Sequence, residues 1–534
     1  MTVALALTEV SFTYPEGELP ALADVTLEVP EGVFALTTGP TGAGKSTLLR
    51  TANGLVPHFT GGTFVGRVRV AGRDTLQHAP RQLADTVAFV PQDPAASFVL
   101  DRVEDELAYG MENLEVQPER MRRRVEEMLD LLGIEPLRSR SVRSISGGER
   151  QRVAIGAALA AGPRVLVLDE PTSQLDPQGA EDVMAALQRL VHDHGMTVLL
   201  AEHRLERVAG FVDLAIGVTD GRVEAGSPGE VLARLDGGPP VARLGRLAGW
   251  HRLPLTVREA RATGIRPRGP ARARRAPAPG DPLLIARGLA AGYDGTEVLR
   301  GIDLQVRQGE VVALMGRNGA GKSTLLRCLA GSIQPARGAV SVPAHAPRPG
   351  VDVALCPQEP ESILFNDTVE GEIRATLDAV LAGGARQRAR GDGGASGSGE
   401  ILDRLRIRAL ARRHPRDTSA GQRLLVATAA VAATGAPILL LDEPTRGLDP
   451  ESKGRLAAFL TAHAADGGAV VVATHDVELA AAVATRVVML AGGELIADGT
   501  PGDVLGDSHV FAPQMTRAFG PGWLTPEQVA AAMT

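Results

Sequence analysis

The chain has few cysteines and no excess of positive charge. Two cysteines, Cys328 and Cys356, occur among its 534 residues. They are too few for a disulfide framework, and a reducing cytoplasm fits this usage best. The formal net charge of −7 gives no overall reason to expect a nucleic-acid partner. The N-terminus, MTVALALTEVSF, lacks a charged segment followed by a cleavable apolar stretch, so we expect no signal peptide.

One uncharged run, residues 424–441, is long enough to be scored as a membrane span. Gly435 and Pro437 interrupt it, however, and both residue types disfavour a continuous helix. We therefore expect the first part of the run to form a helix and the last part to form a buried strand. The chain is predicted to have no membrane span of its own.

An ordered series of motifs runs through the chain twice. Lys45 and Lys322 lie 277 residues apart (322 − 45), and Asp169 and Asp442 lie 273 apart (442 − 169). A nearly constant offset indicates that one unit was duplicated, and it predicts two equivalent domains. The first series is GPTGAGKST (39–47), PQD (91–93), ISGGERQR (145–152), VLVLDEPT (165–172) and EHR (202–204), and the second is GRNGAGKST (316–324), PQE (357–359), TSAGQR (418–423), LLLDEPT (439–445) and THD (474–476).

The apolar patterns predict the same architecture in each half. Alternating apolar residues at the start indicate β-structure, amphipathic segments after the PQ motif indicate an inserted helical subdomain, and later helix–strand alternation indicates a largely parallel sheet. A stretch rich in proline, glycine and arginine predicts a semi-extended tether, a glycine-rich stretch (391–399) predicts a surface loop, and the tail is expected to pack on the second half. The predicted boundaries are 1–236 for the first domain, 237–281 for the linker, 282–507 for the second domain and 508–534 for the tail.

The first motif of each series, G-x-x-x-x-G-K-[ST], predicts a phosphate-binding loop. Glycines let backbone N–H groups curl around a phosphate, and the following helix presents its positive N-terminal end to the same anion. Lys45 and Lys322 are expected to neutralise the terminal phosphates of ATP, and Ser46 and Ser323 to hold Mg²⁺ through their hydroxyl groups. Each loop follows an apolar strand and precedes an apolar helix, as this function requires.

Acidic residues and a histidine after apolar strands predict hydrolysis as well as binding. An Asp-Glu pair ends one strand of each half, at the sheet edge where ligands gather in such folds. The aspartate can bind the metal ion, and the glutamate is suited to orient or deprotonate the attacking water. The histidine follows the next strand, which places an imidazole near the last phosphate. These residues are Asp169, Glu170 and His203 in the first half, and Asp442, Glu443 and His475 in the second.

The sequence ISGGE next to DEPT, with PQ between it and the phosphate loop, resembles the ATP-binding domain of ABC transporters. This resemblance implies an α/β fold of two tandem P-loop NTPase domains, each with a mixed or parallel sheet core, an antiparallel β subdomain and an inserted helical subdomain. It implies an ATPase that uses ATP and Mg²⁺. In that family two domains pair head to tail, so that each ATP lies between the phosphate loop of one domain and the signature of the other. Here the two halves would pair within one chain.

The resemblance also implies individual contacts with ATP and its metal ion. Tyr14 and Tyr293 match the aromatic residue that stacks on adenine, and Gln92 and Gln358 match glutamines that sense the nucleotide. Glycines of the signatures (residues 145–152 and 418–423) would let a helix N-terminus approach the γ-phosphate. The implied nucleotide-binding residues are Tyr14, Gly39, Gly42, Gly44, Lys45, Ser46, Thr47, Gln92, Ser146, Gly147, Gly148, Glu149, Tyr293, Gly316, Gly319, Gly321, Lys322, Ser323, Thr324, Gln358, Ser419, Gly421 and Gln422. The implied metal-binding residues are Ser46, Gln92, Asp169, Ser323, Gln358 and Asp442.

Four segments narrow the resemblance. They look like the paired ATPases of energy-coupling factor importers, which take up vitamins and transition-metal ions in prokaryotes. Such an ATPase is a peripheral protein on the cytoplasmic face of the membrane, and its partners are a transmembrane coupling protein and a substrate-binding membrane subunit, with no nucleic acid. The acidic residues Glu104, Asp105 and Glu106 could meet basic coupling helices of that partner, but acidic residues in the first turn of a helix favour its start anyway, and we expect this second role. The segments are NGLVPHFTGG (53–62), VEDELAYGMENL (103–114), EPTRGLD (443–449) and FAPQMTRAFGPGWLTPEQV (511–529).

The second signature departs from the family pattern. Ala420 places a methyl group where the family usually has glycine and where the backbone must approach a phosphate. The two ATP sites are therefore predicted to be unequal. The site built on Lys322, Glu443 and His475 would face the intact first signature and is expected to be the stronger hydrolyser. Because both halves keep a glutamate and a histidine, neither site is expected to be dead.

Two other functions share parts of the pattern. A fused sugar-import ATPase also carries two such domains in one chain, but the segments at 53–62 and 512–529 argue against it. A soluble twin-ATPase factor that acts on ribosomes or DNA usually joins its halves by a long, charged, helical arm. Residues 264–282 are instead rich in helix-breaking proline and glycine.

Overall fold

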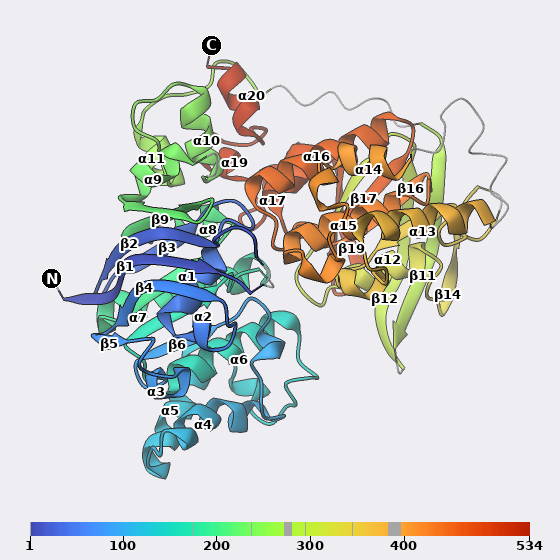
Figure 1. Cartoon of the computed structure of the whole chain (residues 1–534). Coiled ribbons are helices and arrows are strands. Elements are labelled where there is room, and N and C mark those ends of the chain that lie inside the picture. The colour runs from blue at the N-terminus through green and yellow to red at the C-terminus, as the bar shows by residue number, and fades with distance from the viewer. Residues whose placement is uncertain are drawn as a thin grey trace. The chain divides into compact units, whose positions relative to one another are not determined.

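The computed structural model describes residues 2–533 except residues 16, 174, 236–237, 272–279, 294, 344 and 383–396. Its internal contacts divide the chain into two compact units, Met1–Ala260 and Arg261–Thr534. Figure 1 labels the helices and strands of both units. The division agrees with the duplication that the repeated motifs predict.

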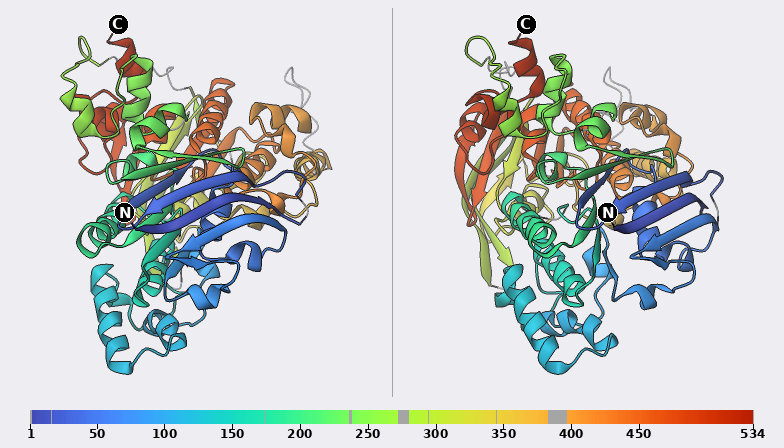
Figure 2. Two further views of the ribbon diagram at one scale, coloured as in Figure 1. Left: turned by 60° about the vertical axis from the view of Figure 1, so that its left-hand side comes forward. Right: turned by 90° about the vertical axis from the view of Figure 1, so that its left-hand side faces the viewer.

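The first unit contains two sheets. The core sheet has the order β10-β9-β3-β8-β7-β6, with parallel neighbours from β6 to β9 and an antiparallel β10 at one edge. β3, β7 and β8 are buried along their whole length, as strands covered on both faces must be. The other sheet, β2-β1-β4-β5, is antiparallel (Figure 2). The strands are β1 (Val3–Thr13), β2 (Leu22–Pro30), β3 (Phe34–Thr38), β4 (Thr63–Val70), β5 (Arg73–Asp74), β6 (Val87–Val90), β7 (Val165–Asp169), β8 (Thr197–Ala201), β9 (Leu214–Thr219) and β10 (Arg222–Gly226).

Helices of the first unit cover both faces of the core sheet. Val165 and Val167 of β7 pack in one cluster with α1 and the antiparallel sheet, while Leu166 and Leu168 pack with α4 to α7 on the other face, because successive strand residues alternate in direction. α4 and α5 follow β6 and precede α6, which confirms the inserted helical subdomain (Figure 1). The helices are α1 (Lys45–Ala52), α2 (Leu55–His58), α3 (Pro80–Leu83), α4 (Val103–Asn113), α5 (Pro118–Leu131), α6 (Gly147–Ala160), α7 (Pro177–His194), α8 (Leu205–Val208), α9 (Pro228–Arg234), α10 (Pro240–Leu247) and α11 (Val257–Ala262), with 3₁₀ turns η1 (Pro94–Ala96) and η2 (Glu135–Leu137).

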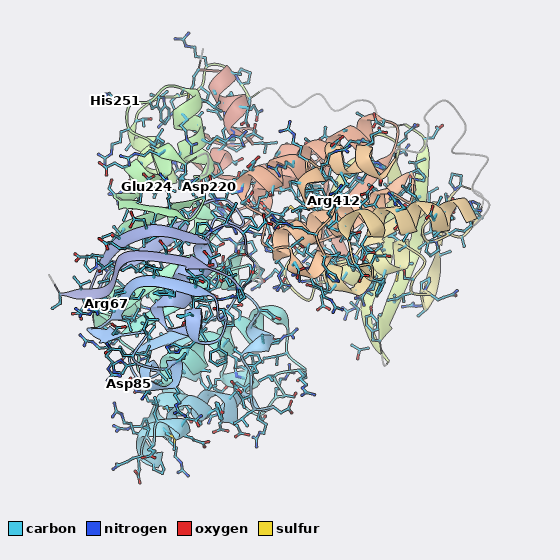
Figure 3. All side chains as sticks on the ribbon, viewed as in Figure 1. Arg67, Asp85, Asp220, Glu224, His251 and Arg412 are labelled. Carbon is cyan, nitrogen blue, oxygen red and sulfur yellow. The ribbon has the colours of Figure 1, made fainter. Side chains whose placement is uncertain are left out.

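Ion pairs of the antiparallel subdomain lie at its surface, as Figure 3 shows for Arg67 and Asp85. Arg67 contacts Asp74 at 3.1 Å, and Arg73 donates two hydrogen bonds to Asp85, at 2.7 and 3.0 Å. Asp74 is only 9% exposed, whereas both side chains of the Arg73–Asp85 pair are exposed, at 40% and 48%, and such exposed pairs contribute little to stability. The fold therefore depends on its buried apolar clusters.

The second unit repeats this architecture, which confirms the predicted fold class. Its core sheet has the order β15-β16-β17-β13-β18-β19, parallel up to β18 and antiparallel at β19, and its smaller sheet, β12-β11-β14, is antiparallel. The strands are β11 (Pro282–Tyr293), β12 (Thr296–Arg307), β13 (Val311–Met315), β14 (Arg337–Ser341), β15 (Val353–Cys356), β16 (Ile438–Asp442), β17 (Ala469–Ala473), β18 (Arg486–Ala491) and β19 (Glu494–Gly499).

The helices of the second unit again include an insertion, α13 and α14, between β15 and the helix that follows the signature. The predicted glycine-rich loop at 391–399 lies largely outside the described residues, and α14 begins at Ser398. The helices are α12 (Lys322–Leu329), α13 (Val369–Ala382), α14 (Ser398–Arg404), α15 (Ala420–Ala432), α16 (Pro450–Ala465), α17 (Val477–Val483), α18 (Pro501–Gly506), α19 (Gln514–Phe519) and α20 (Pro526–Ala531), with 3₁₀ turns η3 (Pro360–Ile363), η5 (Arg408–Leu410) and η6 (Pro415–Asp417).

The uncharged run at 424–441 divides as predicted. Its first part lies in α15 and its last part in the buried strand β16. Within the part of the chain that the structure describes, no helix combines the length and the apolarity that a bilayer crossing needs.

The tether prediction is wrong for residues 240–262, which form α10 and α11. Val241, Ala242 and Leu244 of α10 are fully buried, so apolar residues scattered among prolines and arginines gather on one face of a helix. Pro240 and Pro513 lie 273 residues apart (513 − 240), as do Trp250 and Trp523 (523 − 250). This is the offset of the Asp-Glu pairs, so the duplication extends into the predicted linker. Residues 272–279 of that linker lie outside the described residues.

The C-terminal tail packs on the second unit, as expected. Phe511 and Leu524 belong to one buried cluster with Met315 of β13 and Met489 of β18. The backbone N–H of Gln514 donates to the carboxylate of Glu478 at 2.8 Å. The tail therefore covers apolar surface at the side of the core sheet that β18 forms.

Candidate functional site

The glycines of the first phosphate loop are required by the backbone and by close packing. Gly39 (φ 151°) and Gly44 (φ 109°) occupy a region that other residues rarely adopt. A Cβ atom on Gly39 would lie 2.0 Å from the carbonyl oxygen of Val218, and one on Gly44 would lie 2.3 Å from that of Ala21. Gly42 (φ 84°) faces open space. The loop can thus approach a ligand without side chains in the way.

The second phosphate loop has the same form. Gly316, Gly319 and Gly321 have φ of 149°, 78° and 105°, and a Cβ atom on Gly316 would lie 2.2 Å from the carbonyl oxygen of Leu490. α1 and α12 begin directly after these loops. Because the first N–H groups of a helix have no partner within it, both loops offer donors to a phosphate.

The loop lysines fold back over their own loops. Lys45 Nζ donates to the carbonyl oxygens of Gly39 and Pro40, at 2.9 and 2.8 Å. Lys322 Nζ donates to Gly316 at 2.9 Å and to Arg317 at 3.2 Å. Both lysines are only 7% exposed, so two buried ammonium groups lie where the glycine loops can admit anions.

A hydroxyl group and a carboxylate meet beside each loop. Ser46 hydrogen-bonds Asp169 at the end of β7, and Ser323 hydrogen-bonds Asp442 at the end of β16. Burial raises the pKa of both aspartates, and the neighbouring glutamate in each DE pair raises it further, partly offset by these hydroxyl groups and nearby cations. A cation at this place would favour the ionised form of both aspartates.

Asp442 Oδ1 is buried without a hydrogen-bond partner among the described residues. An orphaned carboxylate oxygen next to a hydroxyl group fits a hard cation such as Mg²⁺. No group of three or more His, Cys, Asp or Glu side chains able to hold a metal ion occurs in the described parts of the chain. The donor set therefore fits an ion that takes its remaining oxygen ligands from the nucleotide and water, with Ser46 and Asp169, or Ser323 and Asp442, as protein ligands.

Glu170 contacts two other candidate site residues of the first unit. Its Oε1 lies 3.1 Å from His203 Nε2, and its Oε2 accepts a hydrogen bond from Gln92 Nε2 at 2.8 Å. Burial by itself would raise the pKa of Glu170, but the charge and hydrogen bond of His203, the charge of Lys45 and the bond from Gln92 outweigh it and lower the pKa. These contacts thus favour the ionised form of the carboxylate, which can accept a hydrogen bond from a water molecule.

The second unit arranges the same residue types differently. Glu443 Oε2 lies 2.6 Å from His475 Nδ1, and Glu443 Oε1 lies 3.9 Å from Lys322 Nζ. Gln358 is exposed, whereas Gln92 binds Glu170. Both glutamates have a φ of 51°, a left-handed conformation that is uncommon outside glycine and often marks functional sites.

The signature serines begin helices. Ser146 caps α6: its Oγ accepts the N–H of Glu149 at 3.3 Å, and the carboxylate of Glu149 accepts the N–H of Ser146 at 2.7 Å. Ser419 and Gln422 form the same reciprocal pair at the start of α15, at 3.2 Å each way. Glu149 and Gln422, which the resemblance implies as nucleotide contacts, thus also stabilise the starts of their own helices.

Within the second signature, Gly421 and the adjacent Ala420 are constrained differently by the packing of their own unit. A Cβ atom on Gly421 would lie 2.3 Å from the carbonyl oxygen of Gly447, so packing demands glycine there. Ala420 is exposed in the first turn of α15, and the corresponding Gly147 begins α6, with Gly148 buried behind it. The methyl group of Ala420 therefore does not disturb its own unit.

The remaining predicted contacts lie around the two loops. Tyr14 Oη and Thr47 Oγ1 are 3.0 Å apart, and the ring of Tyr14 packs edge-on against Phe12, with centroids 4.8 Å apart. Tyr293 is 43% exposed, and Thr324 is buried. Tyr293 thus presents an open ring face, while Tyr14 is partly engaged by its own unit.

A family model described as ABC transporter matches residues 22–173 and 299–446, more than half of the chain. The chain belongs to the ABC transporter family of ATP-binding proteins. A Streptomyces avermitilis protein provisionally named ABC transporter ATP-binding protein is 50% identical to it, covering 98% of this chain and 99% of its own. A Methanosarcina mazei protein with the same provisional name is 32% identical, covering 95% and 90%. The solved structure of the archaeal ribosome recycling factor aABCE1 with stalk protein aP1 is similar in fold, with a TM-score of 0.61, 22% identity and coverage of 93% and 90%.

As an ABC transporter ATPase, the protein binds ATP with Mg²⁺ and hydrolyses the ATP. Members of this family generally work with membrane partners. Membership of this family agrees with two duplicated units that each carry a glycine loop followed by a helix.

Sequence analysis does not predict that the side chains of Glu202, Glu106 and Glu372 are buried, as the structure shows them to be. Glu202 stands next to a predicted catalytic histidine, but its neighbourhood there gives no indication that its carboxylate turns inward. Glu106 lies in a run of acidic residues that equally suits an exposed helix start. Only burial and hydrogen bonding distinguish these glutamates from surface acids.

Proposed function

We propose that this ABC transporter ATPase powers uptake of a vitamin or a transition-metal ion through a membrane partner of the energy-coupling factor type. In this proposal residues 1–236 and 282–507 are the ATPase domains, and the protein is peripheral on the cytoplasmic face of the membrane. The segments at 53–62, 103–114 and 511–529 support this subtype by their resemblance to such importers.

The observation that carries the proposal is a pair of exposed apolar residues beside the glutamine loops. Val99 is 60% exposed and Phe365 81% exposed, and each stands seven residues after the loop glutamine (99 − 92 and 365 − 358). A single exposed apolar residue needs no explanation. Its recurrence at the matching place of both copies favours a surface that meets a partner.

Buried glutamates hold both loops in this exposed form. Glu106, 5% exposed, accepts the backbone N–H groups of Val99 and Leu100 at 3.0 and 2.7 Å. Glu372, 4% exposed, accepts the amide Nδ2 of Asn366 at 2.8 Å. Because a buried carboxylate needs such donors, each loop is fixed while its apolar side chain projects into solvent. We infer that the membrane coupling protein docks on these loops.

We further propose that the halves pair within the chain and that each ATP is completed by the signature of the opposite half. Glu170 and Glu443 would then orient or deprotonate water, and His203 and His475 would act near the terminal phosphate. Mg²⁺ supplies charge stabilisation when it is bound. The exposed position of Ala420 supports inequality of the two sites, because in this proposal its methyl group would face the nucleotide.

The test is membrane association of the variant Val99→Ser/Phe365→Ser. We expect it to keep its ATPase activity in solution. We expect it to lose co-purification with membranes from cells that also express the transmembrane coupling protein and the substrate-binding membrane subunit. Ile496→Ser, which changes another exposed apolar residue (63% exposed), is the matched control and should stay with the membranes. Unchanged membrane recovery of the double variant would refute docking on these loops.

The same cell fractions also test the alternative function as a ribosome factor. A ribosome recycling factor has a similar fold. Sedimentation of the wild-type chain with ribosomes, and not with membranes, would favour that alternative. Recovery with a small integral membrane protein supports uptake.

A further inference from the structure

One buried carboxylate distinguishes the catalytic groups of the two units. Glu202 directly precedes His203, follows the end of β8 and is 2% exposed. The corresponding position before His475 is Thr474 (474 − 202 = 272, the offset of the two histidines). The duplicated units therefore place different chemistry at the same point of the fold.

Glu202 joins the two segments that carry the catalytic candidates of the first unit. Its Oε1 accepts the backbone N–H groups of His203 and Arg204, at 2.9 and 3.1 Å. Its Oε2 accepts the hydroxyl group of Thr172 at 2.5 Å. Hydrogen bonds are stronger in a buried, low-dielectric surrounding than in water. Segment 202–204 is thus tied to the strand end that carries Glu170.

The second unit joins the two segments differently. The side chain of Thr474 is too short to reach Thr445, and its Oγ1 accepts the N–H of Asp476 at 3.0 Å. The hydroxyl group of Thr445, the counterpart of Thr172, is buried without a hydrogen-bond partner in the described structure. The backbone N–H of His475 instead donates to Glu443 Oε2 at 3.4 Å.

Different ring nitrogens of the histidine lie next to the glutamate in the two units: Nε2 of His203 faces Glu170, and Nδ1 of His475 faces Glu443. We propose that Glu202 is a positioning residue, which takes the backbone N–H of His203 and thereby makes His203 meet Glu170 through Nε2. The proposal rests on the proposed roles of Glu170 and His203. It adds to these roles that Glu202 orients the histidine of the first unit, whereas the second unit has Thr474 at the same position.

The kinetic test uses the Glu443→Gln background, which leaves the first-unit glutamate as the remaining general base. Because Gln can accept the same two N–H groups, we expect Glu202→Gln to keep kcat within about threefold. Thr cannot reach Thr172, so we expect Glu202→Thr to lower kcat about tenfold with KM for MgATP within about twofold. Equal kcat losses in both variants, or no loss in the Thr variant, would overturn the proposal.

A second variant guards against misfolding. Thr172→Val removes only the hydroxyl group that donates to Oε2, and we expect a smaller fall in kcat, about threefold, with KM unchanged. A rise in KM without a change in kcat would contradict positioning of a catalytic group.

A spectroscopic readout separates this inference from the proposed function. In full-length protein labelled with ¹⁵N-histidine, ring nitrogen shifts of His203, assigned by comparison with His203→Gln, should move in Glu202→Thr and stay in Glu202→Gln. Unmoved shifts in the Thr variant refute positioning. If the shifts respond while the Glu443→Gln background hydrolyses no ATP, positioning stands and the proposed role of Glu170 fails.

Discussion

At the scale of single residues, burial decides how the two thiols behave. Burial raises the pKa of Cys328 to about 11 and, with a partly offsetting hydrogen bond from Thr428, that of Cys356 to about 12. Because the thiolate is the reactive form, we expect neither cysteine to react with iodoacetamide at pH 8 in the native protein and both to react in denaturant. Reactivity should rise only as the pH approaches these values. Mass spectrometry after timed labelling measures this, and fast native labelling of either thiol would contradict it.

The residue scale also shows where sequence reasoning reaches its limit. The glycine spacing predicts the loop conformation at Gly39 and Gly316 because only glycine tolerates that backbone. The left-handed φ of Glu170 and Glu443 has no such sign in the sequence, since glutamate adopts it only when its surroundings compensate the strain. The contact between Gln92 and Glu170 likewise joins residues 78 positions apart.

At the scale of elements, the local sequence determines where helices begin and end, but it does not determine how the helices pack. Ser146 and Ser419 begin α6 and α15 by capping, as their sequence offset to Glu149 and Gln422 allows. α14 ends at Arg404, because Arg406 takes a left-handed φ of 54° that a helix cannot continue through.

The tail gives a prediction at this scale. Phe511, 9% exposed, packs in the cluster that joins the tail to β13 and β18. We expect Phe511→Ala to lower the free energy of unfolding of the second unit by about 3 kcal/mol, from lost burial and the cavity left behind. Denaturant unfolding of the full chain measures this. The neighbouring Val510→Ala, at a position 41% exposed, should change stability by less than about 0.5 kcal/mol, and equal effects would show that the tail does not stabilise the unit.

At the scale of the whole molecule, two similar units need not do equal work. If each ATP is completed by the opposite signature, the site of Glu443 meets the intact Gly147 and that of Glu170 meets Ala420. We expect Glu443→Gln to lower single-turnover ATP hydrolysis more than Glu170→Gln does, by at least about tenfold in rate between the two variants. Ala420→Gly in the Glu443→Gln background should raise the residual rate. A more damaging Glu170→Gln would reverse the assignment.

The sequence by itself determined the duplication, the ATP chemistry and the fold class, because phosphate loops, strand-end carboxylates and apolar periodicity are local patterns that physics ties to one geometry. Only the tertiary structure decided that α10 and α11 form in the predicted linker, that the tail packs on β13 and β18, and that Glu202 and Glu106 turn inward. The reason is that burial and hydrogen bonding join segments far apart in the chain. A stretch rich in proline or in acidic residues has the same sequence pattern whether it is exposed to solvent or packed against other segments.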